Sequence, residues 1–309
     1  MRFVVYNPQS NGGATGRHWL EIAKLVEAAI GPFSSAPTCC RDDAARLVRE
    51  AVANGAQEVV AVGGDGTISE AINGLFGAEL PSRSQIVFGF VSSGTGEDFR
   101  RALGIAPGIR AACERLASGR TRWIDIGRLT FLDDRLQHTV RYFSNIASLG
   151  LSGSISKAVN GAGLTRLLGA RAMFRYHSVA ELLRYSFPTV RVTVDENQQF
   201  EGPVATVVVA NGSHFGGGMH IAPMADPADG QLDVVVVKGE SKSQLVAAMG
   251  LVYTGQHLRH SAVQIMRGRR IVAEPLVLDR PVLLDVDGEV PGRLPVTFEV
   301  QPSALMVRC

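Results

Sequence analysis

Apolar residues in the first 127 positions follow two alternating spacings. Short apolar runs at 3–6, 59–62 and 86–91 predict buried strands, and a weaker strand is expected to end at 37–38. Between these runs, apolar positions three and four residues apart predict helices at 19–30, 68–76 and 97–103, with another starting near Asp42. Alternating strands and helices predict a doubly wound, nucleotide-binding α/β domain over residues 1–127.

From about residue 128 the pattern changes to short strands with few helices, which predicts a mainly antiparallel β-sandwich over residues 128–294. Helices are expected at 164–185 and 241–253. The expected strands are 128–140, 141–147, 189–194, 204–210, 232–237, 264–266, 270–273, 282–286, 296–300 and 304–308. The last strands, about 295–309, are candidates to return to the first domain.

The stretch 59–67, Val-Val-Ala-Val-Gly-Gly-Asp-Gly-Thr, joins an apolar strand to a glycine turn and a helix. Such a turn directs free backbone N–H groups and the positive end of a helix at a phosphate. No Gly-Lys-Ser/Thr closes the turn, so it is not a P-loop. Asp65 stands where that lysine is expected, and a carboxylate beside polyphosphate implies an intervening Mg²⁺. The alternative is a plain turn in which Asp65 bonds to its own backbone.

Two further features of the sequence concern acidic side chains. Thr67 with Glu70 fits a capping box at a helix start, and Thr95 with Asp98 repeats the Thr-x-x-acid pattern. Asp125 lies inside an apolar, strand-like segment, where a carboxylate needs a partner, a cap or a metal. The alternative for Asp98 is a helix-capping role alone.

Asp287-Gly288 lies between two strand-like runs and is a strong hairpin signal. A tight turn is also a rigid way to present Asp287 and Glu289 at a cleft. Phosphoryl transfer to an alcohol needs a carboxylate that orients the hydroxyl and accepts its proton. The turn and the catalytic interpretation are therefore compatible.

Several motifs carry a family resemblance. Gly-Gly-Asp-Gly-Thr at 63–67 resembles the nucleotide loop of the diacylglycerol kinase and sphingosine kinase superfamily, and NAD kinases and phosphofructokinases carry similar loops. Four further matches resemble the lipid kinases: Asn7-Pro8 with Ser10 and Gly12-Gly13, Gly94-Thr95-Gly96-Glu97-Asp98-Phe99, Asp229-Gly230-Gln231-Leu232-Asp233, and Asp287-Gly288-Glu289. The chain departs from the family at Glu97, where the lipid kinases usually have Asn.

The resemblance implies an ATP-dependent lipid kinase. ATP would lie across the crevice between the domains, and a lipid hydroxyl would attack its γ-phosphoryl group, with Asp287 or Glu289 as the base and Asp65 essential. The candidate nucleotide-binding residues are Asn7, Asn11, Arg17, Thr38, Gly63, Gly64, Asp65, Gly66, Thr67, Glu70, Gly94 and Thr95. The resemblance also implies that Asp65, Asp98 and Asp125 hold Mg²⁺ through water, and that Asp229, with the main-chain carbonyls of Asp226 and Gln231, holds a second, structural Mg²⁺.

Composition excludes several other classes. The net charge of +2 over 309 residues gives no nucleic-acid footprint, and no apolar run approaches the length of a membrane-spanning helix. The first residues enter a strand directly, without a signal-peptide pattern. The four cysteines, Cys39, Cys40, Cys113 and Cys309, show no metal-ligand spacing, and adjacent Cys39 and Cys40 are poor disulfide partners, which favours a reducing cytoplasm.

A lipid kinase without a membrane span is expected to visit the membrane surface. The stretch 164–185 mixes arginines with large apolar residues, which suits docking on an anionic bilayer or, alternatively, a core helix with a basic outer face. Diacylglycerol, a sphingoid base, ceramide and phosphatidylglycerol all offer a suitable hydroxyl. The sequence is also compatible with a homodimer, with an NAD kinase-like enzyme and with a catalytically silent nucleotide or lipid sensor.

Overall fold

In the computed structural model, residues 1–77, 86–94, 96–161, 178–239, 241–277 and 280–309 are described. The chain divides into two compact units, one of Met1–Ile126 with Pro302–Cys309 and the other of Gly127–Gln301. The sequence pattern predicted the first boundary one residue later and the end of the second domain at 294. The second unit continues to 301 because the last strand of the chain pairs within it before it returns to the first unit.

The apolar runs of the first unit form a parallel sheet of order β2–β1–β3–β4, with the chain's last strand beside β4. Its own strands are β1 (Arg2–Tyr6), β2 (Ser34–Pro37), β3 (Glu58–Gly63) and β4 (Val87–Ser92). All six residues of β3 are buried, as expected for a central strand covered on both faces.

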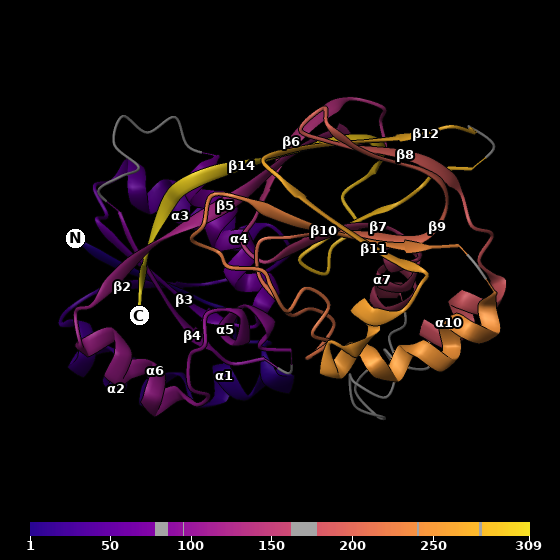
Figure 1. The fold of residues 1–309 in the computed structure, drawn as a ribbon. Helices are drawn as coiled ribbons and strands as arrows, with labels where there is room; N and C mark the ends of the chain where they lie inside the picture. The colour runs from indigo at the N-terminus through magenta and orange to yellow at the C-terminus, as the bar shows by residue number, and fades with distance from the viewer. Residues whose placement is uncertain (78–85, 95, 162–177, 240, 278–279) are drawn as a thin grey trace. The chain divides into compact units, whose positions relative to one another are not determined.

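Helices cover both faces of this sheet, as the doubly wound pattern predicts. Figure 1 shows α2 (Trp19–Ile30) and α6 (Ile109–Ala117) on one side and α3 (Asp43–Ala53) and α4 (Asp65–Phe76) on the other. The loop expected between β1 and α2 instead contains a 3-10 turn, Asn11–Gly13, and a short helix α1 (Ala14–Arg17). A further short helix, α5 (Asp98–Ala102), follows β4.

The second unit is a β-sandwich of antiparallel strand pairs, and its core lies between two layers. One layer contains β7 (Ile146–Gly150), β9 (Gln198–Ala210), β10 (Leu232–Lys238), β11 (Val263–Gly268) and β13 (Leu284–Val286). The other contains β5 (Thr121–Leu132), β6 (His138–Phe143), β8 (Thr189–Val194), β12 (Arg270–Pro275) and β14 (Arg293–Arg308), with the first half of β9 paired to β8.

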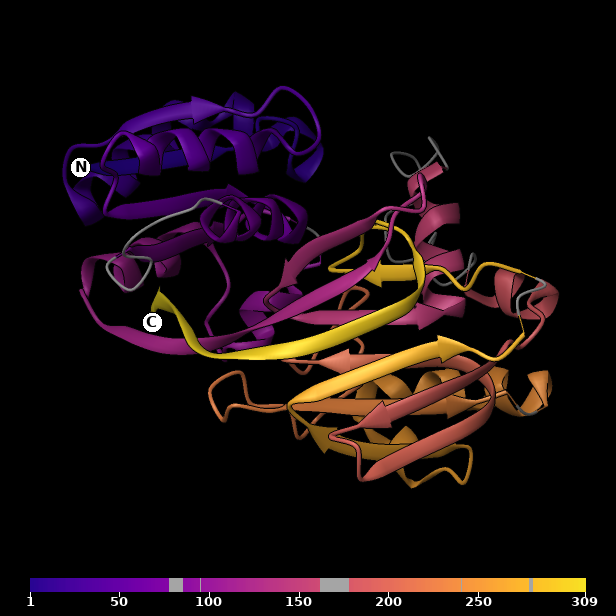
Figure 2. The same ribbon diagram turned by 90° about the horizontal axis from the view of Figure 1, so that it is seen from above.

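The end of the chain forms one strand where the sequence pattern predicted two. β14 pairs with β12 through residues 296–299 and with β4 through Met306 and Val307, and Figure 2 traces it to the C-terminus. The expected break falls at Ser303, whose φ is +46°. Its N–H donates to the Asp125 carboxylate at 2.7 Å, so a side chain satisfies the backbone where the strand bends.

Helices cover the outer face of the β7–β9–β10 layer. They are α7 (Leu151–Gly161), α10 (Lys242–Ala248), and the 3-10 segments η3 (Met249–Thr254) and η4 (Gln256–Arg259). The predicted helix 241–253 therefore changes from α to 3-10 geometry at Met249. Of the predicted helix 164–185, residues up to 177, with Arg166, Arg171, Phe174 and Arg175, lie outside the described residues, and 178–184 are helical. Within the described ranges no helix is both long and apolar enough to cross a membrane.

A bulge in β9 breaks the alternation of its side chains. Val237 of β10 pairs with Thr206 and Lys238 with Val204, which leaves Ala205 as the extra residue. A bulge redirects side chains that strict alternation would send to opposite faces. Ala205 and Thr206 consequently line the same pocket.

Candidate functional site

The two glycine turns of the first unit touch backbone to backbone. β3 and β4 are parallel neighbours, so the turns that follow them meet at the same edge of the sheet. Ser93 N–H donates to the Gly63 carbonyl at 2.7 Å, and a Cβ on Gly94 would lie 2.8 Å from the Gly64 Cα. Only glycine at position 94 allows this approach.

Asp65 connects these turns electrostatically. Its carboxylate accepts hydrogen bonds from the N–H groups of Asp98 and Phe99, each at 3.3 Å, at the start of α5. A Cβ on Gly96 would lie 2.5 Å from the Asp65 Oδ2, so glycine keeps the space beside this oxygen open. Burial raises the pKa of Asp65, and the backbone N–H groups of Asp98, Phe99 and Glu97 oppose that rise.

Both predicted capping patterns are wrong in detail. α4 begins at Asp65, with extended Gly64 as its N-cap, so Thr67 lies inside the first turn of the helix. Glu70 Oε2 instead accepts the N–H of Ala44 at 3.2 Å and ties α4 to α3. The glycine turn starts the helix earlier than side-chain capping would, because extended Gly64 leads directly into Asp65, an acid at the positive helix end.

The second turn departs from its expected cap in the same way. Thr95 lies outside the described residues, and α5 has Glu97 as its N-cap without a side-chain capping bond. Glu97 is in the left-handed conformation, with φ of +55°, and its carboxylate contacts Arg100 at 3.0 Å. Asn adopts this conformation more readily than Glu, so the family's usual residue suits the backbone and this chain adds an ion pair.

The opening motif packs against the central turn. Asn7 Nδ2 donates to Thr67 Oγ1 at 3.3 Å. A chain of hydroxyl groups runs from Ser10 through buried Thr15 to Ser93, with spacings of 2.6 and 2.7 Å. Three loops at the carboxyl ends of β1, β3 and β4 are thereby joined. Ser10 belongs to the opening motif, whereas the sequence pattern did not mark Thr15 and Ser93.

The remaining nucleotide candidates lie on the loops after β1 and β2. Asn11 is exposed and left-handed, and Arg17 donates to the Gly12 carbonyl at 3.2 Å. Thr38 is buried at the end of β2, where its N–H donates to the Tyr6 carbonyl at 2.8 Å. Their contacts with nucleotide stay predictions.

The other two acids of the predicted Mg²⁺ cluster have protein partners. Asp98 pairs with Arg101 at 3.0 Å, and Asp125 accepts the N–H of Ser303. Among the described residues, Asp65, Asp98 and Asp125 do not form a group whose ligand atoms all lie within 4.8 Å of one another. An ion shared by these three acids therefore needs bridging water, as the resemblance implied.

The predicted second Mg²⁺ site in the other unit contains an arginine. Asp229 accepts the N–H of Gln231 at 3.0 Å and pairs with the Arg267 guanidinium. Asp226 accepts the N–H of Ala228 at 3.1 Å. Arg267 supplies a positive charge to the same turn, so the structural Mg²⁺ stays a prediction.

The Asp287-Gly288 hairpin has the geometry that its sequence predicts. Asp287 and Gly288 have φ of +48° and +90°, and Val286 and Glu289 exchange backbone hydrogen bonds. The Asp287 carboxylate accepts the N–H of Ile146 at 3.0 Å, which fixes its direction. Glu289 pairs with Arg141 at 3.3 Å, and both side chains are largely buried.

Asp285, two residues before the turn, was missed by the sequence analysis. It is 7% exposed and accepts hydrogen bonds from Ser156 Oγ at 3.1 Å and from Gly288 N–H at 2.9 Å. Burial raises its pKa to about 7, with a further contribution from the nearby Asp287 and Glu289 charges. An acid inside an apolar strand was the signal used for Asp125, and the same signal marks Asp285.

Asp285 also lines a pocket of about 140 Å³ that lies wholly within the second unit. The pocket lies between β9 with its bulge and the covering helices, and its walls are overwhelmingly apolar. Representative lining residues are Leu151, Ile155, Leu182, Ala205, Leu245 and Met249. An apolar cavity with the Asp285 carboxyl in its wall suits an apolar ligand that carries a hydroxyl.

These features define a class of protein: a phosphotransferase with glycine turns on a parallel sheet and an acidic hairpin on a β-sandwich. A family model described as "Diacylglycerol kinase catalytic domain" matches residues 2–129, and one described as "YegS C-terminal NAD kinase beta sandwich-like domain" matches residues 145–309. The chain belongs to the diacylglycerol kinase family and is a lipid kinase.

Named relatives agree with this assignment. A diacylglycerol kinase of Bacillus subtilis (strain 168) is 28% identical over 96% of this chain and 91% of its own length. A diacylglycerol kinase of Mycobacterium tuberculosis is also 28% identical, over 86% of this chain and 81% of its own. The crystal structure of a diacylglycerol kinase from Bacillus anthracis has the same fold, with a TM-score of 0.72 at 20% identity over 99% of this chain and 96% of that one.

Proposed function

We propose that this kinase transfers the γ-phosphoryl group of ATP to the hydroxyl of diacylglycerol. The acyl chains of the diacylglycerol would enter the apolar pocket of the second unit. The apolar pocket is the observation that carries the proposal. Its lining can bury the acyl chains of a lipid, whereas a dinucleotide has no long apolar chain to bury there. The names of the relatives favour diacylglycerol over the other candidate lipids.

The first unit supplies the groups for ATP. The kinase family implies ATP as phosphoryl donor, and the turn after β3, which touches the turn after β4, offers the N-terminus of α4 to its phosphates. In-line transfer depends mainly on positioning and charge stabilisation, which rigid backbone donors provide.

Mg²⁺ fits the acids of the same unit. Each Asp65 oxygen accepts a backbone hydrogen bond and, as a carboxylate oxygen, can accept more than one contact, and Gly96 leaves space at Oδ2. Asp65 and Asp98, with Asp125, would hold the ion through water, and the ion would neutralise phosphate charge.

The acceptor hydroxyl needs a base, and the hairpin supplies two candidates. The N–H of Ile146 orients the Asp287 carboxylate through a hydrogen bond, whereas Glu289 forms an ion pair with Arg141. In either case the carboxylate would orient the lipid hydroxyl and accept its proton. Asp285 would hold the turn in place through Gly288.

Turnover of labelled ATP against a panel of lipids tests the proposal. The panel contains diacylglycerol, a sphingoid base, ceramide and phosphatidylglycerol, with NAD as control. Highest kcat/KM on diacylglycerol supports the proposal. Preference for another lipid would replace the substrate, phosphorylation of NAD would indicate an NAD kinase-like enzyme, and binding without turnover would indicate a silent sensor.

We also infer that the enzyme meets its lipid at a membrane surface, because a long-chain lipid has negligible concentration in water. The stretch 164–185 is the candidate docking surface on sequence grounds. The two buried residues in its described part, Ser178 and Leu182, line the pocket rather than a membrane face. Sedimentation with anionic and neutral vesicles should show salt-sensitive binding to the anionic ones. Equal binding after replacement of Arg166, Arg171 and Arg175 by Gln would contradict this docking surface.

A further inference from the structure

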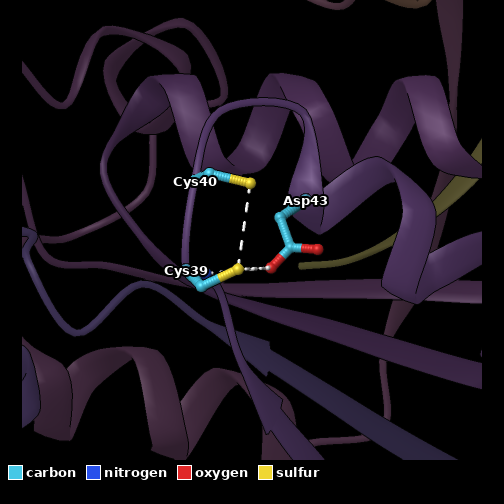
Figure 3. A group of neighbouring side chains, drawn as sticks. All are labelled: Cys39, Cys40 and Asp43. Atoms are coloured by element: carbon cyan, nitrogen blue, oxygen red, sulfur yellow. Dashed lines mark hydrogen bonds between the residues drawn. The ribbon is translucent and has the colours of Figure 1, made fainter.

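Two cysteines and an aspartate converge on the turn between β2 and α3. Cys39 and Cys40 are exposed on this turn, and Asp43 is the first residue of α3. Figure 3 shows the three side chains facing one another. The two Sγ atoms are 3.8 Å apart, Cys39 Sγ lies 3.1 Å from Asp43 Oδ2, and one ligand atom from each residue lies within 4.8 Å of the others.

The Asp43 carboxylate is held in its orientation by groups around it. Arg46 donates to Oδ1 from Nε at 2.9 Å and from Nη2 at 2.6 Å. The Cys39 N–H donates to Oδ2 at 2.9 Å, on the side that faces the thiols. Asp43 is 4% exposed, and these donors lower its pKa, the backbone N–H of Cys39 most of all. Second partners of this kind commonly orient metal-binding carboxylates.

The spacing fits a tetrahedral ion. With Zn–S bonds of about 2.3 Å, two thiolates on one tetrahedral Zn²⁺ stand roughly 3.8 Å apart. The two sulfurs already have this separation. The Cys39–Asp43 contact is shorter than the roughly 3.5 Å of a shared ion, because a thiol proton lies between these atoms.

We propose that Cys39, Cys40 and Asp43 form a binding site for one thiophilic divalent ion, of which Zn²⁺ is the type case. Thiolates prefer such ions, whereas the Mg²⁺ of the proposed reaction prefers oxygen ligands. The site is thus chemically separate from the acids around ATP. Three protein ligands leave the fourth position to water, so the ion exchanges with solvent and the site differs from a closed structural site.

The ion must displace protons from the thiols. In the ion-free protein the Cys39 thiol donates a hydrogen bond to Asp43 Oδ2, so this thiol carries its proton. Ion binding therefore releases protons. The positive N-terminus of α3 and Arg46 favour the thiolates that replace them.

Metal titration of the full-length, reduced protein tests the site directly. Co²⁺ should bind with one equivalent per chain and give the charge-transfer absorption of a cobalt–thiolate bond. Either ion should release protons when it binds the ion-free protein, and Zn²⁺ should displace bound Co²⁺. Zn²⁺ should also raise the melting temperature, because an ion that binds only the folded state stabilises it. The readout does not depend on kinase activity, so it can fail while the lipid kinase assignment stands.

Variants decide whether these residues are the ligands. Cys39→Ser and Cys40→Ser should each weaken Co²⁺ binding at least tenfold and reduce the thiolate absorption, whereas Cys309→Ser, at a partly exposed cysteine elsewhere, should change neither. Asp43→Asn should weaken binding while the absorption of any remaining complex persists. Unchanged binding in the Cys39→Ser/Cys40→Ser double variant would overturn the proposal. No thiolate absorption in the wild-type protein under reductant would overturn it as well.

Discussion

Two buried carboxyl groups, Asp65 in the first unit and Asp285 in the second, show how different surroundings control the same side chain. Burial raises the pKa of both. Several backbone N–H groups donate to Asp65, and they oppose the rise in its pKa because they favour its anion. Asp285 receives one backbone N–H and one hydroxyl, and its two acidic neighbours add to the rise.

The difference separates two kinds of site. Backbone donors at helix starts keep Asp65 beside a place for phosphates and a cation, where a negative charge is useful. Asp285 lies at the wall of an apolar pocket, where a neutral carboxyl is cheaper than an anion. The glycine turns of the first unit therefore hold a charge, whereas the apolar pocket of the second unit disfavours one.

Asp65→Asn should have the largest effect and abolish turnover without unfolding the protein. The amide keeps the shape and can accept from Asp98 or Phe99, but it removes the charge assigned to the cation. Activity as a function of Mg²⁺ should be measured with thermal melting. A folded variant with near-normal activity would reduce Asp65 to a turn residue.

Asp287→Asn and Glu289→Gln should show which hairpin carboxylate is the general base. Loss of the general base should slow single-turnover transfer by roughly 10²- to 10⁴-fold for one of the two, with ATP affinity nearly unchanged. The residue whose loss slows transfer more is the base. If neither variant slows the chemical step, the hairpin is structural and the base lies elsewhere.

Ala205→Phe should partly fill the pocket at the β9 bulge. We expect KM for long-chain diacylglycerol to rise about tenfold, because a lost chain contact of this size is worth ~1–3 kcal/mol. A short-chain diacylglycerol is the matched control and should be affected less. Equal effects on both substrates would place the acyl chains outside this pocket.

Asp285→Asn should stabilise the protein at neutral and alkaline pH. The carboxyl has an ordinary pKa of 3.8 and one of about 7 when folded, so the unfolded chain loses its proton first as pH rises. Wild-type stability should fall by roughly 1.4 kcal/mol per pH unit between about 4 and 7, and this loss should end above 7. Denaturant unfolding of both proteins across pH 4–8 measures it. Parallel curves would show that Asp285 is ionised in the folded state.

Glu97→Asn should have the smallest effect. Relief of a left-handed Glu gains about 1 kcal/mol, and loss of the partly buried ion pair with Arg100 costs about as much. Stability should change by less than about 1 kcal/mol and activity should persist. A large gain in activity would instead show that Glu97 restrains the enzyme.

The sequence by itself determined the local elements. Apolar spacing predicted the strands of both units. The glycine-rich stretches predicted turns between strand and helix, and Asp287-Gly288 predicted a hairpin. These features depend on backbone rules that act over a few residues. Motif order then indicated the family. The misplaced capping boxes at Thr67 and Thr95 show the limit of such rules, since a glycine turn started α4 earlier than side-chain capping predicted.

Only the tertiary structure decided what depends on distant segments. The apolar pocket joins helices to a bulge in β9, and Asp285 becomes unusual because Ser156 and the hairpin enclose it. The cysteines alone had no metal-ligand spacing, and the turn into α3 adds Asp43 to them. Burial, pKa and ligand geometry are sums over neighbours in space, and the order of residues along the chain does not contain them.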